Sequence, residues 1–216
     1  MSAEFKKYPI CDADMWVNMC LTGFCDRVFS KYGKLVFADV VEQEVLAWER
    51  SDGRYKKVAT DFKDHKASQN ILVISHTRDL TEDIRTILES ALTDLDFKHG
   101  LLNRPQEKNK GEFVSALYAD HFEIPFMKTD DSAFKEGGAG NKEFPDLLIK
   151  DWYVLVEELA INQSEKLKIR GLLENERKSM KNDFERQKEK KKESAGEKQK
   201  LLQLDRLKQK LNRSRL

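Results

Sequence analysis

Several features that define common protein classes are missing from this chain of 216 residues. Its three cysteines, Cys11, Cys20 and Cys25, lack the paired spacing of a disulfide framework or a zinc site. We therefore expect a reducing, cytoplasmic compartment. No apolar run of about 18 residues occurs, and the first ten residues lack the apolar core of a signal peptide. We expect neither a membrane span nor export.

The signatures of several enzyme classes are missing as well. The four histidines are scattered without metal-ligand spacing, and no nucleophile elbow of a serine hydrolase occurs. The glycines within Phe134–Glu143 lack the spacing of a dinucleotide- or phosphate-binding motif, so we expect a mobile lid or a plain connection there. Cys11 lies in an apolar segment beside Asp12, which favours a core residue over a nucleophile.

Charge is distributed unevenly along the chain, although the formal net charge is only +1. Residues 164–216 carry 18 Lys and Arg against 9 Asp and Glu, a balance of +9. The residues before them carry 21 basic and 29 acidic side chains, a balance of −8. We expect an acidic domain over residues 1–160 and a charged, basic helical tail over residues 161–216.

The basic tail has two candidate partners. Its charge suits a polyanion such as nucleic acid, but it can equally neutralise a partner protein or the acidic domain itself. Near its end, one helical face carries the leucines at positions 201, 204, 207 and 211. Such a stripe needs a docking surface, and a partner helix or the domain is a better one than a membrane.

The order of apolar segments predicts the fold class. Strands are expected at Tyr8–Cys11, Leu35–Phe37, Ile71–Ile74 and Ile124–Met127. Helices are expected at Met15–Leu21, Val40–Glu49, Val58–Ser68, from Thr81 onward, at Glu112–Glu123, and at Asp146–Ala160, which has room for a short strand at Leu147–Ile149. This alternation indicates a three-layer α/β/α domain with a mainly parallel sheet.

Acidic residues recur where these strands end and where helices follow. They are Asp12 and Asp14 after the first strand, Glu44 beside an apolar helix stripe, Glu112 at a helix start, and Asp130 and Asp131 after the fourth predicted strand. Each has an ordinary alternative. Asp14 can cap a helix, Glu112 is a favourable charge in a first turn, and adjacent aspartates are common in turns. Asp12, at the end of the strand, is less easily explained as a cap.

Several carboxylates in one crevice point to a bound cation. The carboxyl ends of parallel strands share one edge of a sheet, so these side chains are expected to gather there. Carboxylates that repel one another cannot all stay ionised without compensation. Oxygen ligands suit Mg²⁺ or Mn²⁺, and two such ions can activate water for phosphodiester cleavage.

These segments resemble the PIN domain, a family of metal-dependent nucleases that includes many bacterial toxin ribonucleases. The resemblance covers about residues 8–160. CDADMWV resembles the opening strand with its first acid, VVEQEV the "V-x-x-E" helix, KGEFVSALYA a "GE" helix variant, and KTDDSAF the closing "T-x-D-x-x-F" turn. The matching positions are Asp12 with Asp14, Glu44, Glu112, and Thr129, Asp131 and Phe134 with the adjacent Asp130. The basic tail lies outside the family's usual extent.

The resemblance implies an endoribonuclease that leaves a 5′-phosphate and a 3′-hydroxyl. Asp12, Glu44, Glu112 and Asp131 would be its catalytic residues, and these four together with Asp14 and Asp130 would hold Mg²⁺ or Mn²⁺. RNA would be the substrate, an antitoxin or another protein a possible partner, and a homodimer a possible assembly. The alternative is a non-catalytic scaffold that binds RNA or a protein through its basic tail.

Overall fold

The computed structural model of the protein describes residues 2–51, 53–98, 107–183, 185, 186 and 188. By its internal contacts the chain divides into two compact units, Met1–Leu173 and Glu174–Leu216. In the second unit, residues 174–183 are helical. The leucine stripe that the sequence predicts at positions 201–211 lies outside the described residues.

A five-stranded sheet forms the centre of the first unit. Its strands are β1 (Ile10–Cys11), β2 (Leu35–Ala38), β3 (Ile71–Ile74), β4 (Met127–Lys128) and β5 (Ile149–Lys150). They lie in the order β3-β2-β1-β4-β5, and every neighbouring pair is parallel. This arrangement confirms the prediction of an α/β fold with a mainly parallel sheet.

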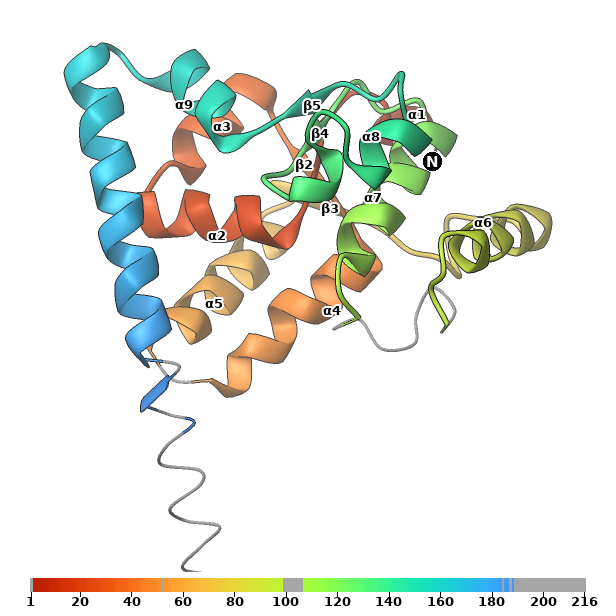
Figure 1. The fold of residues 1–216 in the computed structure, drawn as a ribbon, viewed down its shortest axis with the longest axis horizontal. Helices are drawn as coiled ribbons and strands as arrows, with labels where there is room; N and C mark the ends of the chain where they lie inside the picture. Colours follow the sequence, from red (N-terminus) through yellow and green to blue (C-terminus); the bar gives the residue numbers. More distant parts are fainter. Residues whose placement is uncertain (1, 52, 99–106, 184, 187, 189–216) are drawn as a thin grey trace, which may run out of the picture. The chain divides into compact units, whose positions relative to one another are not determined.

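Helices cover both faces of the sheet (Figure 1). In chain order they are α1 (Ser2–Phe5), α2 (Ala13–Thr22), α3 (Cys25–Tyr32), α4 (Asp39–Ala47), the 3-10 turn η1 (Trp48–Arg50), α5 (Arg54–Ala67), α6 (Glu82–Asp94), α7 (Lys110–His121), the 3-10 turn η2 (Ser132–Phe134), α8 (Ala139–Glu143) and α9 (Trp152–Leu159). Helices α2, α3, α5 and α9 lie on one side and α1 and α7 on the other, while α4 contacts α2, α5 and α7.

An aromatic cluster fixes the position of α2 on the sheet. The ring of Trp16 lies 5.9 Å from that of Phe37 on β2 and 5.6 Å from that of Phe62 on α5. The Trp16 indole N–H donates to the Val58 carbonyl at 3.1 Å, which satisfies the polar atom of a fully buried side chain. Aromatic pairs of this kind contribute about 0.5–1.5 kcal/mol beyond area burial. The first turn of α2 is therefore held at the carboxyl edge of the sheet.

Some predicted elements have other bounds in the structure. The fourth strand comprises Met127–Lys128 and not Ile124–Met127, because Pro125 has no N–H to donate to a ladder. The helix predicted from Asp146 begins at Trp152, where the Asp151 side chain caps it, and β5 precedes it.

The glycine segment between Phe134 and Glu143 was expected to be a mobile lid or a plain connection, and residues 135–138 of this segment form a turn. The segment also contains helix α8 and packs closely on η2. A Cβ at Gly140 would lie 2.7 Å from Cε1 of Phe134, so only glycine permits this approach. In the part of the chain that the structure describes, each helix is too short or too polar to cross a lipid bilayer.

Candidate active site

Asp12 stands where β1 ends and α2 begins. Its backbone is extended (φ −86°, ψ 175°), and its Oδ1 accepts the Met15 N–H at 2.7 Å. Asp12 is therefore the N-cap of α2, a role that the sequence favoured for Asp14 instead. Asp14 lies in the first helical turn with its side chain exposed. The cap fixes one oxygen of Asp12 and thereby orients the other.

The second oxygen of Asp12 is the most unusual polar atom at this edge. Oδ2 is buried, and none of the described residues donates a hydrogen bond to it. Burial raises the pKa of Asp12 well above its usual range, and the negative charge of Glu112 raises it further. The neighbouring Thr129 side chain counteracts this rise in pKa, but it is not in hydrogen-bonding geometry with Oδ2.

Glu44 on α4 faces the start of α7 across a close backbone approach. An added Cβ at Gly111 would lie 3.6 Å from Glu44 Oε2 and 3.1 Å from Val41 Cγ2. Glycine at this position lets α7 pack against α4 with the half-buried Glu44 carboxylate between them. The sequence shows a glycine before Glu112, but the spatial reason for that glycine appears only once the two helices are packed.

Glu44 and Glu112 have similar electrostatic environments. Burial raises the pKa of Glu44 to about 7, and the charges of Glu112 and Asp14 add to the effect. Burial likewise raises the pKa of Glu112 to about 7, with further contributions from Asp131 and Asp14. The structure thus brings five of the six predicted acids into electrostatic contact: Asp12, Asp14, Glu44, Glu112 and Asp131.

Asp131 is held by the turn that follows β4. Its backbone N–H donates to the Thr129 hydroxyl at 3.0 Å, and its Oδ1 accepts the Ala133 N–H at 2.6 Å as the cap of η2. Thr129 is only 1% exposed and follows Lys128, whose register partner is the residue before Asp12. The threonine of the predicted turn therefore stands between the two aspartates.

Asp130 has different partners from the other five acids. Its Oδ2 accepts the Asn18 side-chain amide at 2.8 Å, and its Oδ1 accepts the Trp152 backbone N–H at 2.9 Å. These bonds connect the end of β4 to α2 and to the first turn of α9. Asn18 is fully buried, and an asparagine between Val17 and Met19 was the signal in the sequence that could have indicated a buried polar partner.

The arrangement is an acidic site of oxygen donors whose charges repel one another. Among the residues that the structure describes, no three His, Cys, Asp or Glu side chains form a group recognisable as a metal site. At the carboxyl edge of the sheet, burial and the neighbouring negative charges raise the pKa values of Asp12, Glu44 and Glu112. Such a site favours any cation that can enter it.

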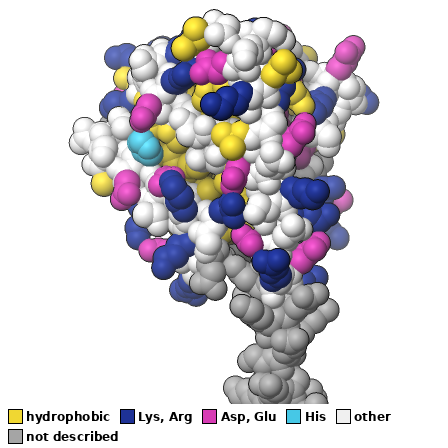
Figure 2. Space-filling view, turned by 90° about the vertical axis from the view of Figure 1, so that its left-hand side faces the viewer, with side chains coloured by type: hydrophobic (Ala, Val, Ile, Leu, Met, Phe, Trp, Pro, Cys, Tyr) yellow, Lys and Arg dark blue, Asp and Glu magenta, His cyan; other side chains and the backbone are white. Residues whose placement is uncertain are grey.

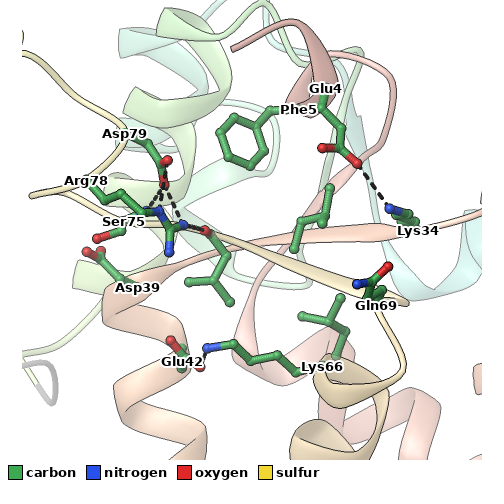
Figure 3. Close-up of a pocket in the computed structure, with 13 residues that line it drawn as sticks. Glu4, Phe5, Lys34, Asp39, Glu42, Lys66, Gln69, Ser75, Arg78 and Asp79 are labelled. Carbon is green, nitrogen blue, oxygen red and sulfur yellow. Dashed lines mark hydrogen bonds and ion pairs between the residues drawn. The ribbon is translucent and has the colours of Figure 1, made fainter. Parts of the chain in front are cut away.

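A separate hollow of about 480 Å³ runs along the free edge of β3 (Figure 3). Its lysines and its arginine are paired: Lys34 with Glu4 at 3.0 Å, Lys66 with Glu42, and Arg78 with Asp79 at 2.8 Å. Arg78 also donates to the Val73 carbonyl at 3.0 Å, which blocks part of the strand edge. None of the six predicted acids lines this hollow, so it is not the candidate site.

Comparison of the chain with protein-family models and with curated protein sequences gives no match.

Proposed function

We propose that the protein is a Mg²⁺- or Mn²⁺-dependent endoribonuclease of the PIN type. The observation that supports this most is the buried Oδ2 of Asp12, to which none of the described residues donates a hydrogen bond and which is close to the negative charge of Glu112. A buried acceptor of this kind costs about 1–3 kcal/mol if nothing satisfies it. A cation would satisfy it and would relieve the repulsion among the neighbouring carboxylates.

The donor set suits a hard divalent cation. Its members are carboxylates, which are the ligands that Mg²⁺ and Mn²⁺ prefer. Asp12, Glu44, Glu112 and Asp131 would hold the metal, and the exposed Asp14 would assist at the solvent side. We assign Asp130 a positioning role, because both its oxygens accept hydrogen bonds that join β4 to α2 and α9.

The chain's own residues contribute order to this site before any ligand binds. The Met15 N–H fixes Asp12, and the Ala133 N–H fixes Asp131, each through one carboxylate oxygen. Preorganised ligands lose little conformational freedom when a ligand binds. When bound, the metal would supply charge neutralisation at the scissile phosphate and acidify a water molecule. In the hydrolysis, water attacks the phosphorus in line and the 3′-oxygen leaves with a proton.

An acidic site needs basic surface elsewhere to hold RNA. On the face that Figure 2 shows, basic and acidic side chains are interspersed and do not form one continuous basic patch. Residues 164–216 carry a balance of +9, whereas the residues before them carry a balance of −8. Phosphate contacts from that segment would make binding weaken steeply with salt.

The proposal is tested first by metal binding without catalysis. Unfolding temperatures are measured in EDTA and in increasing Mn²⁺ for the wild type, for Asp12→Asn and for Glu49→Gln. Glu49 is exposed and paired with Lys63 at 2.8 Å, so its variant serves as a matched control. Mn²⁺ should stabilise the wild type and the control and should not stabilise Asp12→Asn. Equal stabilisation of all three proteins would contradict a site built on Asp12.

A further inference from the structure

A second hollow, of about 600 Å³, lies between α6, α7 and the segment that follows α8. It contains none of the six acids of the candidate active site. Its floor comes from one face of α6 and from the end of α7. We call it the α6–α7 groove.

The floor of the α6–α7 groove is apolar. Ile87, Leu88, Ala91 and Leu95 follow one another at helical spacing along α6 and present one face to the groove. Leu117 and Ile124 continue the floor, and the opposite wall contains Phe144 and Leu147. Ile87 is 61% exposed, although it occupies an apolar face of an amphipathic helix. Leu88, Leu117 and Ile124 are buried at the base of the groove, whereas Ala91, Leu95, Phe144 and Leu147 are half-buried beside Ile87. Apolar surface that stays exposed in a groove marks a contact surface for a partner.

The rim of the groove carries charge of one sign. Four acidic residues line it, Asp120, Glu123, Glu143 and Asp146, and among the described residues that line it there is no lysine or arginine. Glu123 pairs with Lys6 at 3.4 Å, and both of those side chains are largely exposed. A pair of that kind contributes little, so the rim stays strongly acidic.

We infer that the α6–α7 groove binds an amphipathic helix of a partner protein, one whose apolar stripe is flanked by lysine or arginine. The apolar floor would receive the stripe, and the four rim carboxylates would pair with the flanking basic side chains. Helix α6 has 13 residues and is therefore about 20 Å long. A partner helix of about four turns would match that length.

Other occupants fit the groove less well. Its walls are helices and a loop, so it offers no strand edge for an extended peptide. Nucleic acid would bring phosphates against four carboxylates. A second copy related by a two-fold axis would place one acidic rim against another. The inference does not depend on the proposed nuclease activity, because it uses none of the residues assigned to that activity.

The test uses two synthetic 16-residue helical peptides and the intact protein. Both peptides carry leucines at alternating spacings of three and four, and the remaining positions are mainly lysine in one and mainly glutamate in the other. Binding is measured by calorimetry at 50 and 200 mM salt. The lysine peptide should bind at least tenfold more tightly than the glutamate peptide, and its affinity should fall with salt. Equal affinities, or no binding of the lysine peptide, would overturn the inference.

Two protein variants locate the binding surface. Ile87→Asp places a charge on the exposed floor position, where folding should tolerate it, and should weaken binding at least tenfold. Asp146→Lys should weaken binding several-fold and reduce its salt dependence. Asp26→Lys makes the same charge change on exposed surface of α3 and should leave affinity within twofold. Unchanged binding by Ile87→Asp would overturn the inference.

Sedimentation of the protein alone then separates a partner from self-association. A monomer with or without Ile87→Asp excludes a second copy as the occupant and supports the inference over self-association. A dimer that Ile87→Asp dissociates would assign the groove to a second copy and overturn the choice of occupant.

Discussion

Replacing Glu112 by glutamine is expected to stabilise the metal-free protein at pH 8. Burial and the charges of Asp131 and Asp14 raise the pKa of Glu112 from its ordinary 4.5 to about 7. Keeping this side chain ionised at pH 8 therefore costs about 3 kcal/mol relative to the unfolded chain, at roughly 1.36 kcal/mol per pKa unit. Glutamine removes the charge and keeps the shape. It also buries an amide, so we expect a net gain of about 1–3 kcal/mol.

The pH dependence identifies the cause of this gain. A carboxyl group whose pKa is raised by folding does not lower the free energy of unfolding below about pH 4.5. As the pH rises from there through about 7, the free energy of unfolding falls. The advantage of Glu112→Gln should therefore be small at pH 5 and full at pH 8. For a domain of this size, each kcal/mol of added free energy of unfolding raises the unfolding temperature by about 2–4 °C.

The assay is denaturant unfolding in EDTA at pH 5 and pH 8, with Glu49→Gln as the control. The pKa of Glu49 is lowered by its hydrogen bond with Lys63, so the control should gain nothing at pH 8. Adding Mn²⁺ should reverse the order, because the wild type gains a ligand that the variant binds poorly. A variant that is destabilised at pH 8, or equally stabilised at both pH values, would refute the reasoning.

Three further outcomes are expected. Gly111→Ala would place a methyl group within 3.1 Å of Val41 Cγ2 and 3.6 Å of Glu44 Oε2. The increase in unfolding temperature that Mn²⁺ produces should therefore fall at least severalfold, while the metal-free protein stays folded. Lys128 is fully buried without a hydrogen-bond partner among the described residues, and burial lowers its pKa to about 8. The free energy of unfolding of the wild type should therefore rise between pH 8 and 10. Lys128→Met should lack that rise, and its free energy of unfolding at pH 7 should be about 1–3 kcal/mol higher than that of the wild type. A truncation that ends at Leu173 keeps the ion pair of Arg27 with Glu165 at 2.7 Å, whereas one that ends at Ala160 would remove it. Because the tail is proposed to contact phosphates, the protein that ends at Leu173 should bind RNA more weakly, and its affinity should depend less on salt.

Local sequence chemistry was sufficient for some elements of the fold. β3 comprises the predicted residues Ile71–Ile74, because a short apolar run between polar turns has few alternatives. Thr81 caps α6 as expected, since its hydroxyl accepts the Ile84 N–H. The parallel sheet followed from the alternation of such runs with helical patterns.

Other elements depend on contacts that a local pattern does not contain. β5 has only two residues, too few to give a strand pattern in the sequence, and it is a strand because it pairs with β4. Helix α3 (Cys25–Tyr32) was not predicted, because its apolar positions are few and only Val28 in it is fully buried. At the site, the choice between Asp12 and Asp14 as the cap depended on where β1 ends.

The grouping of the acids also needed the tertiary structure. Sequence order placed every acid except Glu44 at a strand end or a helix start, and the sheet brought Asp12 and Asp131 to the ends of neighbouring strands. The position of Glu44 depends on the approach of α4 to α7 at Gly111, which no spacing within either helix reveals. Asp130 was predicted to assist the metal, and its bonds to Asn18 and Trp152 depend on how α2 and α9 pack.

RNA cleavage shows directly whether the carboxylates at this edge of the sheet support metal-dependent hydrolysis. A structured RNA pool is incubated with the wild type, with Asp12→Asn and with Glu49→Gln, each in Mn²⁺, Mg²⁺ or EDTA. Asparagine keeps a side-chain oxygen to accept the Met15 N–H, so Asp12→Asn should remain folded. The wild type and the control should cut RNA only when metal is present and should leave 5′-phosphate ends, whereas Asp12→Asn should not cut. Absence of cutting by the folded wild type in either metal, or equal cutting by Asp12→Asn, would contradict the proposed ribonuclease activity.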